Sequence, residues 1–137
     1  MGQPIDLHIF HRNRLFRDCL ASVLSGVSYF HVTPHDHTQL ERWDKLDSSG
    51  KHVGLIDMQL PDGIAVDLIR RLTTTMASKA VVLVAHDDPD AIIRCVAAGA
   101  TGCVLEEASL EELRVAIDRI VAGETFCSPR LVSSMFQ

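Results

Sequence analysis

Charged and imidazole side chains stand at the ends of three apolar runs of the chain. His11 and Arg12 follow the first run, Asp57 lies near the end of the second, and Glu106 follows the third. Carboxylates pair strongly with a guanidinium group, and together with an imidazole they are also ligands for metal ions. With His11 neutral, these residues carry one positive and two negative charges. We therefore expect a polar site of net charge −1, in which Arg12 pairs with Asp57, Glu106 or both.

Histidines offer a second set of candidate ligands. His31, His35 and His37 lie close together in the sequence, and in an extended chain His35 and His37 point to the same side. Such a pair is compatible with a metal site, but a solvated loop is the simpler interpretation. His11 is likewise either a metal ligand or proton shuttle, or a polar loop residue.

Two further groups have simpler roles. His86, Asp87 and Asp88 could bind a cation, although Asp88 before Pro89 is better explained as a helix cap. The cysteines form no C-x-x-C pair and lack the spacing of a zinc site, so we interpret them as small apolar residues. They are Cys19, Cys95, Cys103 and Cys127.

Length and composition limit the class of protein. The 137 residues, 47% hydrophobic and 23% charged, suit one globular domain that needs no disulfides. A net charge of −5 and few aromatic residues argue against direct nucleic-acid binding by this piece. No apolar run reaches membrane-spanning length and no signal peptide is present, so we expect a cytoplasmic protein without a membrane association.

Apolar patterning alternates between strand and helix periods along the chain. Strands are expected at residues 5–10, 27–33, 53–58, 80–85 and 101–105. Helices are expected at 15–24, 38–47 (with Trp43) and 64–76, then from Pro89 to Gly99, from Ser109 to Gly123, and from Ser128-Pro129 onward.

This alternation predicts an α/β fold of five βα units. It is a doubly wound, flavodoxin-like sandwich with a five-stranded parallel sheet and helices on both faces. Sites in such sheets lie outside the carboxyl ends of the strands, where His11, Arg12, Asp57 and Glu106 fall. We place the domain at residues 1–124, and a linker or short helix at 125–137.

Short motifs occur in a specific order over nearly the whole chain. They occupy residues 15–17, 55–61, 97–102, 108–113, 123–124 and 128–129. In this order and at these intervals they resemble receiver domains (CheY-like) of bacterial two-component response regulators. The closest likeness is to the NarL/FixJ (LuxR-type) subfamily, in which a helix-turn-helix DNA-binding domain follows.

The resemblance implies phosphoryl transfer to an aspartate, with Mg²⁺ held by an acidic pair and the product stabilised by a hydroxyl and a lysine. The acceptor position is Asp57, which is present. The other positions depart from the family: the acidic pair aligns with His11 and Arg12, the hydroxyl with Val84, the lysine with Glu106, and the switch aromatic with Cys103.

These departures predict an atypical, degenerate pocket. Without the acidic pair Mg²⁺ should bind weakly or not at all, and we expect no other cofactor and no metal site. Arg12 would take over the charge-balancing role of the ion. Each missing stabilising group can cost on the order of 10²–10³ in the rate of phosphorylation.

We therefore expect a regulatory, non-enzymatic module of a LuxR-type transcriptional regulator that signals through dimerisation or partner contact. A homodimer would form through the helix after Pro89 with the last strand and following helix, or through the first and last long helices. A tethered DNA-binding domain would complete the protein. Two alternatives stay open: a receiver phosphorylated on Asp57 by a sensor histidine kinase, and a stand-alone ligand-binding or adaptor domain.

Overall fold

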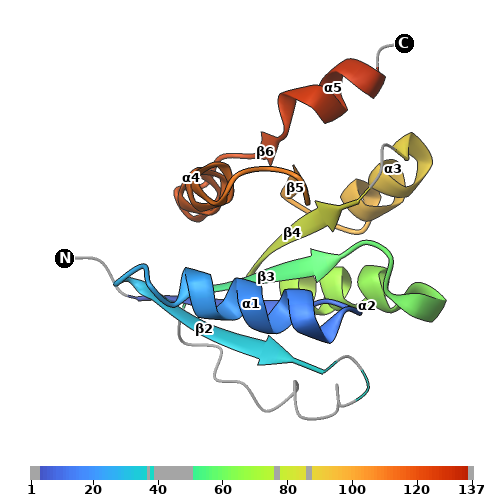
Figure 1. Cartoon of the computed structure of the whole chain (residues 1–137). Coiled ribbons are helices and arrows are strands. Elements are labelled where there is room, and N and C mark those ends of the chain that lie inside the picture. The colour runs from blue at the N-terminus through green and yellow to red at the C-terminus, as the bar shows by residue number, and fades with distance from the viewer. Residues whose placement is uncertain (1–3, 37, 39–50, 76–77, 86–87, 136–137) are drawn as a thin grey trace.

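The structure, a computed structural model, describes residues 4–36, 38, 51–75, 78–85 and 88–135. Strands and helices alternate along the chain (Figure 1). The elements are β1 (Ile5–Phe10), α1 (Arg14–Leu24), β2 (Phe30–His35), β3 (Lys51–Asp57), the 3-10 turn η2 (Pro61–Gly63), α2 (Ile64–Arg70), the π-helical turn η3 (Arg71–Thr75), β4 (Lys79–Val84), α3 (Pro89–Ala97), β5 (Gly102–Leu105), α4 (Leu110–Val121), β6 (Phe126–Cys127) and α5 (Pro129–Met135).

All strands pair in parallel, in the order β2-β1-β3-β4-β5-β6. The sheet therefore has six strands, and the expected five-stranded sheet is wrong in this respect. The additional strand is Phe126–Cys127, which pairs with Gly102 and Cys103 at what would otherwise be an exposed edge. Two residues are too few to show a strand period, so the sequence could not reveal this strand.

Several element boundaries differ from the sequence prediction. The second strand begins at Phe30 because residues 24–30 form turns, in which Val27 N bonds Leu24 O and Phe30 N bonds Val27 O. The third strand lies at Lys51–Asp57. The helix expected to reach Met76 changes to a π-helical turn after Arg70. The expected helix at 38–47, with Trp43, falls almost wholly outside the described residues.

Helices cover both faces of the sheet, as predicted (Figure 1). On one face α1 and α4 pack against side chains of β1, β3, β4 and β5; fully buried members of this core include Leu7, Ile9 and Leu55 on the strands and Ile117 on α4. On the other face α2, α3 and α5 cover a second core that includes Phe10, Ile56, Val84, Ile92 and Leu131. Leu131 is fully buried, so the segment after β6 packs onto the domain.

Caps fix where the helices begin and end beside the carboxyl edge of the sheet. Asn13 accepts a hydrogen bond from Phe16 N at the start of α1, Asp88 caps α3 and Ser109 caps α4, the last two as predicted. Gly99, with φ of 118°, allows the left-handed turn after α3. The loop after β1 is therefore only three residues long, and it places His11 and Arg12 over the sheet edge.

Three imidazoles form a chain across strands β2, β1 and β3. His8 Nδ1 lies 2.9 Å from His35 Nε2, and His8 Nε2 lies 2.9 Å from His52 Nδ1. A neutral imidazole has one donor and one acceptor nitrogen, so the chain satisfies its hydrogen bonds when all three rings are neutral. His31 instead contacts Asp6 at 3.1 Å, and His37 lies outside the described residues. His31 and His35, which the sequence places in one group, thus contact different residues: Asp6 and His8.

Burial opposes protonation of this histidine chain. Desolvation, reinforced by His35 and His52, lowers the pKa of His8 to about 3. Desolvation and the nearby Arg17 lower the pKa of His35 to about 4. Since both values lie below the ordinary value of 6.5, the unfolded chain takes up these protons before the folded chain does.

We predict that the histidine chain makes the fold acid-sensitive. Its contribution to stability is complete above about pH 6.5 and is lost as the pH falls from there toward about 3. For His8 alone, the loss between pH 7 and pH 5 is about 2 kcal/mol. Urea unfolding at the two pH values should show that His8→Gln removes about this much of the pH dependence, while the exposed His31→Gln leaves it unchanged. An equal pH dependence in His8→Gln and the parent chain would contradict this account.

Candidate functional site

Asp57 ends β3 and is fully buried at the carboxyl edge of the sheet. Arg12 Nη1 donates to both carboxylate oxygens, at 2.9 Å to Oδ1 and 2.7 Å to Oδ2. Backbone N–H groups add one bond to each oxygen: Arg12 N donates to Oδ2 at 3.1 Å and Gln59 N to Oδ1 at 2.9 Å. A buried carboxylate needs this compensation, and here the guanidinium supplies the opposite charge.

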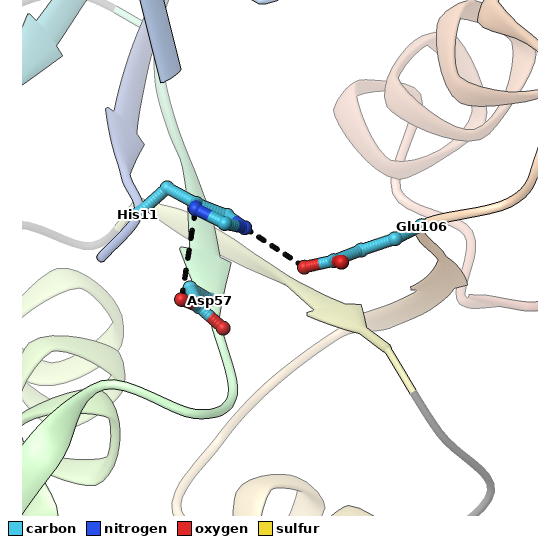
Figure 2. Close-up of side chains that lie close together, drawn as sticks. All are labelled: His11, Asp57 and Glu106. Atoms are coloured by element: carbon cyan, nitrogen blue, oxygen red, sulfur yellow. Dashed lines mark hydrogen bonds and ion pairs between the residues drawn. The ribbon is translucent and has the colours of Figure 1, made fainter. Parts of the chain in front are cut away.

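His11 lies between the two carboxylates of the site (Figure 2). Its Nε2 is 2.8 Å from Glu106 Oε1, and its Nδ1 is 3.7 Å from Asp57 Oδ2. Asn13 N donates to Nδ1 at 3.0 Å. Because Nδ1 accepts a hydrogen bond, this network assigns the proton of a neutral ring to Nε2, which donates to Glu106.

The polar side chains of the site therefore form two separate pairs. Arg12 pairs with Asp57, as the charge argument expects, whereas Glu106 contacts His11 instead of Arg12. His11 and Asp57 are buried, while the Arg12 side chain is 41% exposed. The site thus has a buried floor and a half-exposed cation at its rim.

Val84 and Cys103 lie where the resemblance places a hydroxyl and an aromatic side chain. Val84 ends β4 and is buried in the core under α2 and α3, where it offers no side-chain hydrogen bond. Cys103 is buried on β5 opposite Cys127 of β6. Burial, with smaller effects of Cys127 and Cys95, raises the pKa of the Cys103 thiol to about 12. Both side chains therefore act as core residues.

The magnesium ion of the receiver family does not fit this site. In that family an acidic pair supplies oxygen ligands beside the acceptor aspartate, and Mg²⁺ requires such hard ligands. Here an imidazole and a guanidinium stand at those positions, and the guanidinium nitrogen lies 2.7 Å from Asp57. Among the described residues, His11, Asp57 and Glu106 are the group whose ligand atoms all lie within 4.8 Å of one another.

Some features of the site were not anticipated from the sequence. The His11–Glu106 contact joins β1 to β5, which are separated by β3 and β4 in the sheet, so strand adjacency alone does not predict it. Gln59 and Asn13 contribute through backbone N–H groups, which residue type does not signal. Asp88 is a helix cap, and its expected neighbours His86 and Asp87 lie outside the described residues.

Sequence comparison finds transcriptional regulators. The chain is 25% identical over 96 residues to the DNA-binding transcriptional activator DevR/DosR of Mycobacterium tuberculosis, a match that covers 69% of this chain and 44% of that protein. It is 30% identical over 84 residues to the transcriptional regulatory protein UhpA of Salmonella typhimurium, which covers 61% and 42%. The chain thus spans less than half the length of these relatives. No protein-family profile matches the chain.

Structure comparison finds receiver domains. The isolated receiver domain of RcsB from Salmonella enterica, solved with the phosphomimetic BeF3−, superposes with a TM-score of 0.79 at 19% sequence identity. The superposition covers 97% of this chain and 99% of that domain. The resemblance expected from the motifs is confirmed: the fold is that of a response-regulator receiver. No helix in the described part of the chain is long and apolar enough to cross a membrane.

We predict that Arg12 and Asp57 are energetically coupled. Arg12→Ala leaves a buried carboxylate with backbone donors alone, so it should lower the free energy of unfolding by about 1–3 kcal/mol. In Arg12→Ala/Asp57→Asn this penalty should largely disappear, because the uncompensated charge is gone. Urea unfolding of the four chains measures the coupling. Strictly additive effects would show that the pair is not an interacting unit.

Proposed function

We propose that this chain is an atypical receiver domain, the regulatory module of a LuxR-type transcriptional regulator, and that it signals without Mg²⁺-dependent phosphorylation of Asp57. The observation that carries the proposal is the Arg12 guanidinium on the buried Asp57 carboxylate. The receiver fold and the transcriptional regulators among the relatives support the class of protein.

The pocket lacks the groups that promote phosphoryl transfer to Asp57. Each carboxylate oxygen already accepts two hydrogen bonds, so attack on phosphorus requires Arg12 to leave. Glu106 places a second negative charge where the family has a lysine, and it would repel an incoming phosphoryl group. His11 and Arg12 stand in place of the acidic pair that would hold a charge-neutralising Mg²⁺, and each lost stabilising group costs on the order of 10²–10³ in rate.

The route from the pocket to the surface is also altered. Val84 cannot donate a hydrogen bond to a phosphoryl oxygen, and Cys103 is held between strands by packing. A phosphate on Asp57 would therefore lack the contacts that move a switch aromatic in the family. The chain performs no reaction of its own in this account, and its output depends on which surfaces contact another protein.

A tethered DNA-binding domain completes the proposed regulator. In this proposal residues 1–124 form the receiver, and residues 125–137 begin the linker to the DNA-binding domain. Within that linker, β6 and α5 pack on the receiver. RcsB, whose receiver has this fold, has been solved as dimers bound to DNA. Dimerisation of the receiver would raise the effective concentration of two tethered domains at paired half-sites.

Two apolar surfaces are available for such a dimer. The first is a groove of about 300 Å³ between α1 and α4, lined by residues such as Phe16, Leu20, Leu113 and the exposed Val23. The second lies on α3, where Ile93 and Val96 are exposed. Exposed apolar side chains of this kind are typical of protein contact sites.

We predict that the chain gains no phosphoryl group from a small-molecule donor. Intact mass spectrometry after incubation with Mg²⁺ and acetyl phosphate should show the unmodified mass for the parent chain and for Asp57→Asn. A positive control restores the residues of the family: His11→Glu, Arg12→Asp, Val84→Thr and Glu106→Lys.

The restored variant should gain one phosphoryl group under the same conditions. A gain in the parent chain that Asp57→Asn abolishes would instead establish the phospho-receiver alternative. In a second experiment the parent chain is incubated with a purified, phosphorylated sensor kinase. Transfer of the phosphoryl group from the kinase to Asp57 would also contradict the proposal.

We predict a homodimer whose interface includes one of the two apolar surfaces. Sedimentation velocity over a range of concentrations should show self-association of the parent chain. A charge at the interface disrupts apolar packing, so either Val23→Glu on α1 or Val96→Glu on α3 should shift the chain to monomer while the other variant behaves as the parent. A parent chain that stays monomeric throughout, or two variants that dimerise normally, would rule out dimerisation through these surfaces.

A further inference from the structure

The polar site has a ligand arrangement that differs from a magnesium pocket. His11 Nδ1 and Asp57 Oδ2 lie 3.7 Å apart (Figure 2). Metal–nitrogen and metal–oxygen bonds of zinc are each about 2.0–2.2 Å, so this separation suits one ion bound to both atoms. The ion would displace the hydrogen bonds that Arg12 Nη1 now donates to Oδ2 and Asn13 N to Nδ1. Imidazole and carboxylate together suit zinc and related first-row ions, whereas magnesium prefers oxygen alone.

We propose that His11 and Asp57 bind a divalent transition-metal ion of the zinc class, with Glu106 as the positioning residue for His11 and Arg12 as the competitor of the ion. The proposal goes beyond the phosphate-independent signalling proposed above, and it uses Glu106 in a role that the family's lysine cannot have.

The tautomer of His11 already suits such an ion. Glu106 Oε1 accepts the Nε2 proton at 2.8 Å, which leaves Nδ1 unprotonated. Metal-binding histidines commonly donate their other N–H to a carboxylate, which fixes the ring and raises its basicity. The ion would replace a single hydrogen bond at Nδ1, the one from Asn13 N.

Asp57 is also held ready once Arg12 leaves. The backbone donors Arg12 N and Gln59 N keep the carboxylate in place, one on each oxygen. The Arg12 side chain is 41% exposed, so it can move into solvent without disturbing the core. Asp57 and Glu106 would then carry two negative charges, which a divalent ion neutralises.

Competition with Arg12 gives the sharpest test. Isothermal titration calorimetry of the whole chain with ZnCl₂ should show one ion bound per chain, and MgCl₂ should give no binding. Arg12→Ala removes the competitor, so we expect the affinity for Zn²⁺ to rise by about tenfold or more, the factor expected from releasing a charge-assisted hydrogen bond. Arg12→Gln gives the same test if the alanine variant does not fold.

Loss of the other partners should weaken binding in a graded way. His11→Gln and Asp57→Asn should abolish binding at this site, and Glu106→Ala should weaken it about 10- to 100-fold, as loss of an orienting carboxylate does. His31→Gln and Cys19→Ser alter exposed candidate ligands elsewhere and should leave the affinity unchanged.

Several results would overturn the inference. These are absence of zinc binding by both the parent chain and Arg12→Ala, equal affinity in these two chains, or undiminished affinity in His11→Gln and Asp57→Asn. None of them affects the phosphodonor assay, which uses magnesium alone, so a failure here is distinguishable from a failure of the proposed function.

Discussion

The site depends on the cost of burying the Asp57 carboxylate. An unpaired charge in the interior is so unfavourable that the surroundings must supply an opposite charge and hydrogen bonds. Arg12 does this from the loop after β1, together with two backbone N–H groups. The loop between β1 and α1 is short and ends at Asn13, the N-cap of α1, and it holds that guanidinium over the edge of the sheet. In this chain, a side chain thus supplies the charge that a bound ion would supply in the receiver domains it resembles.

In the proposed regulator, the Arg12–Asp57 pair also changes how a signal can leave the pocket. When an internal cation balances the acceptor, the resting pocket is already complete. Val84 and Cys103 both belong to the core between the sheet and α2, α3 and α5. In that proposal, the output comes from surfaces that exist in the resting state, such as the groove between α1 and α4. The polar network of His11 and Glu106 connects that groove, where Glu106 forms part of the lining, to Asp57.

Local sequence signals predicted much of this arrangement, and long-range register accounts for the rest. The apolar run of β4, the caps Asp88 and Ser109, and the Arg12–Asp57 pair follow from patterning, capping chemistry and charge. Strand β6 depends on an edge that only the folded sheet provides. The histidine chain depends on register, which sets His8 between His35 and His52 on neighbouring strands. Contacts of this kind join residues that are far apart in the sequence, so local sequence patterns do not predict them.

In the proposed receiver, Arg12 occupies the place at Asp57 that a metal ion would take in the domains this chain resembles. A crystal structure of the chain grown with Mg²⁺ and beryllium fluoride, the phosphomimetic used for the RcsB receiver, tests it most directly. We predict that Arg12 will remain on both oxygens of Asp57, with neither an ion nor a fluoride adduct on the carboxylate. A beryllium fluoride adduct and a magnesium ion at Asp57, with Arg12 displaced into solvent, would contradict the account.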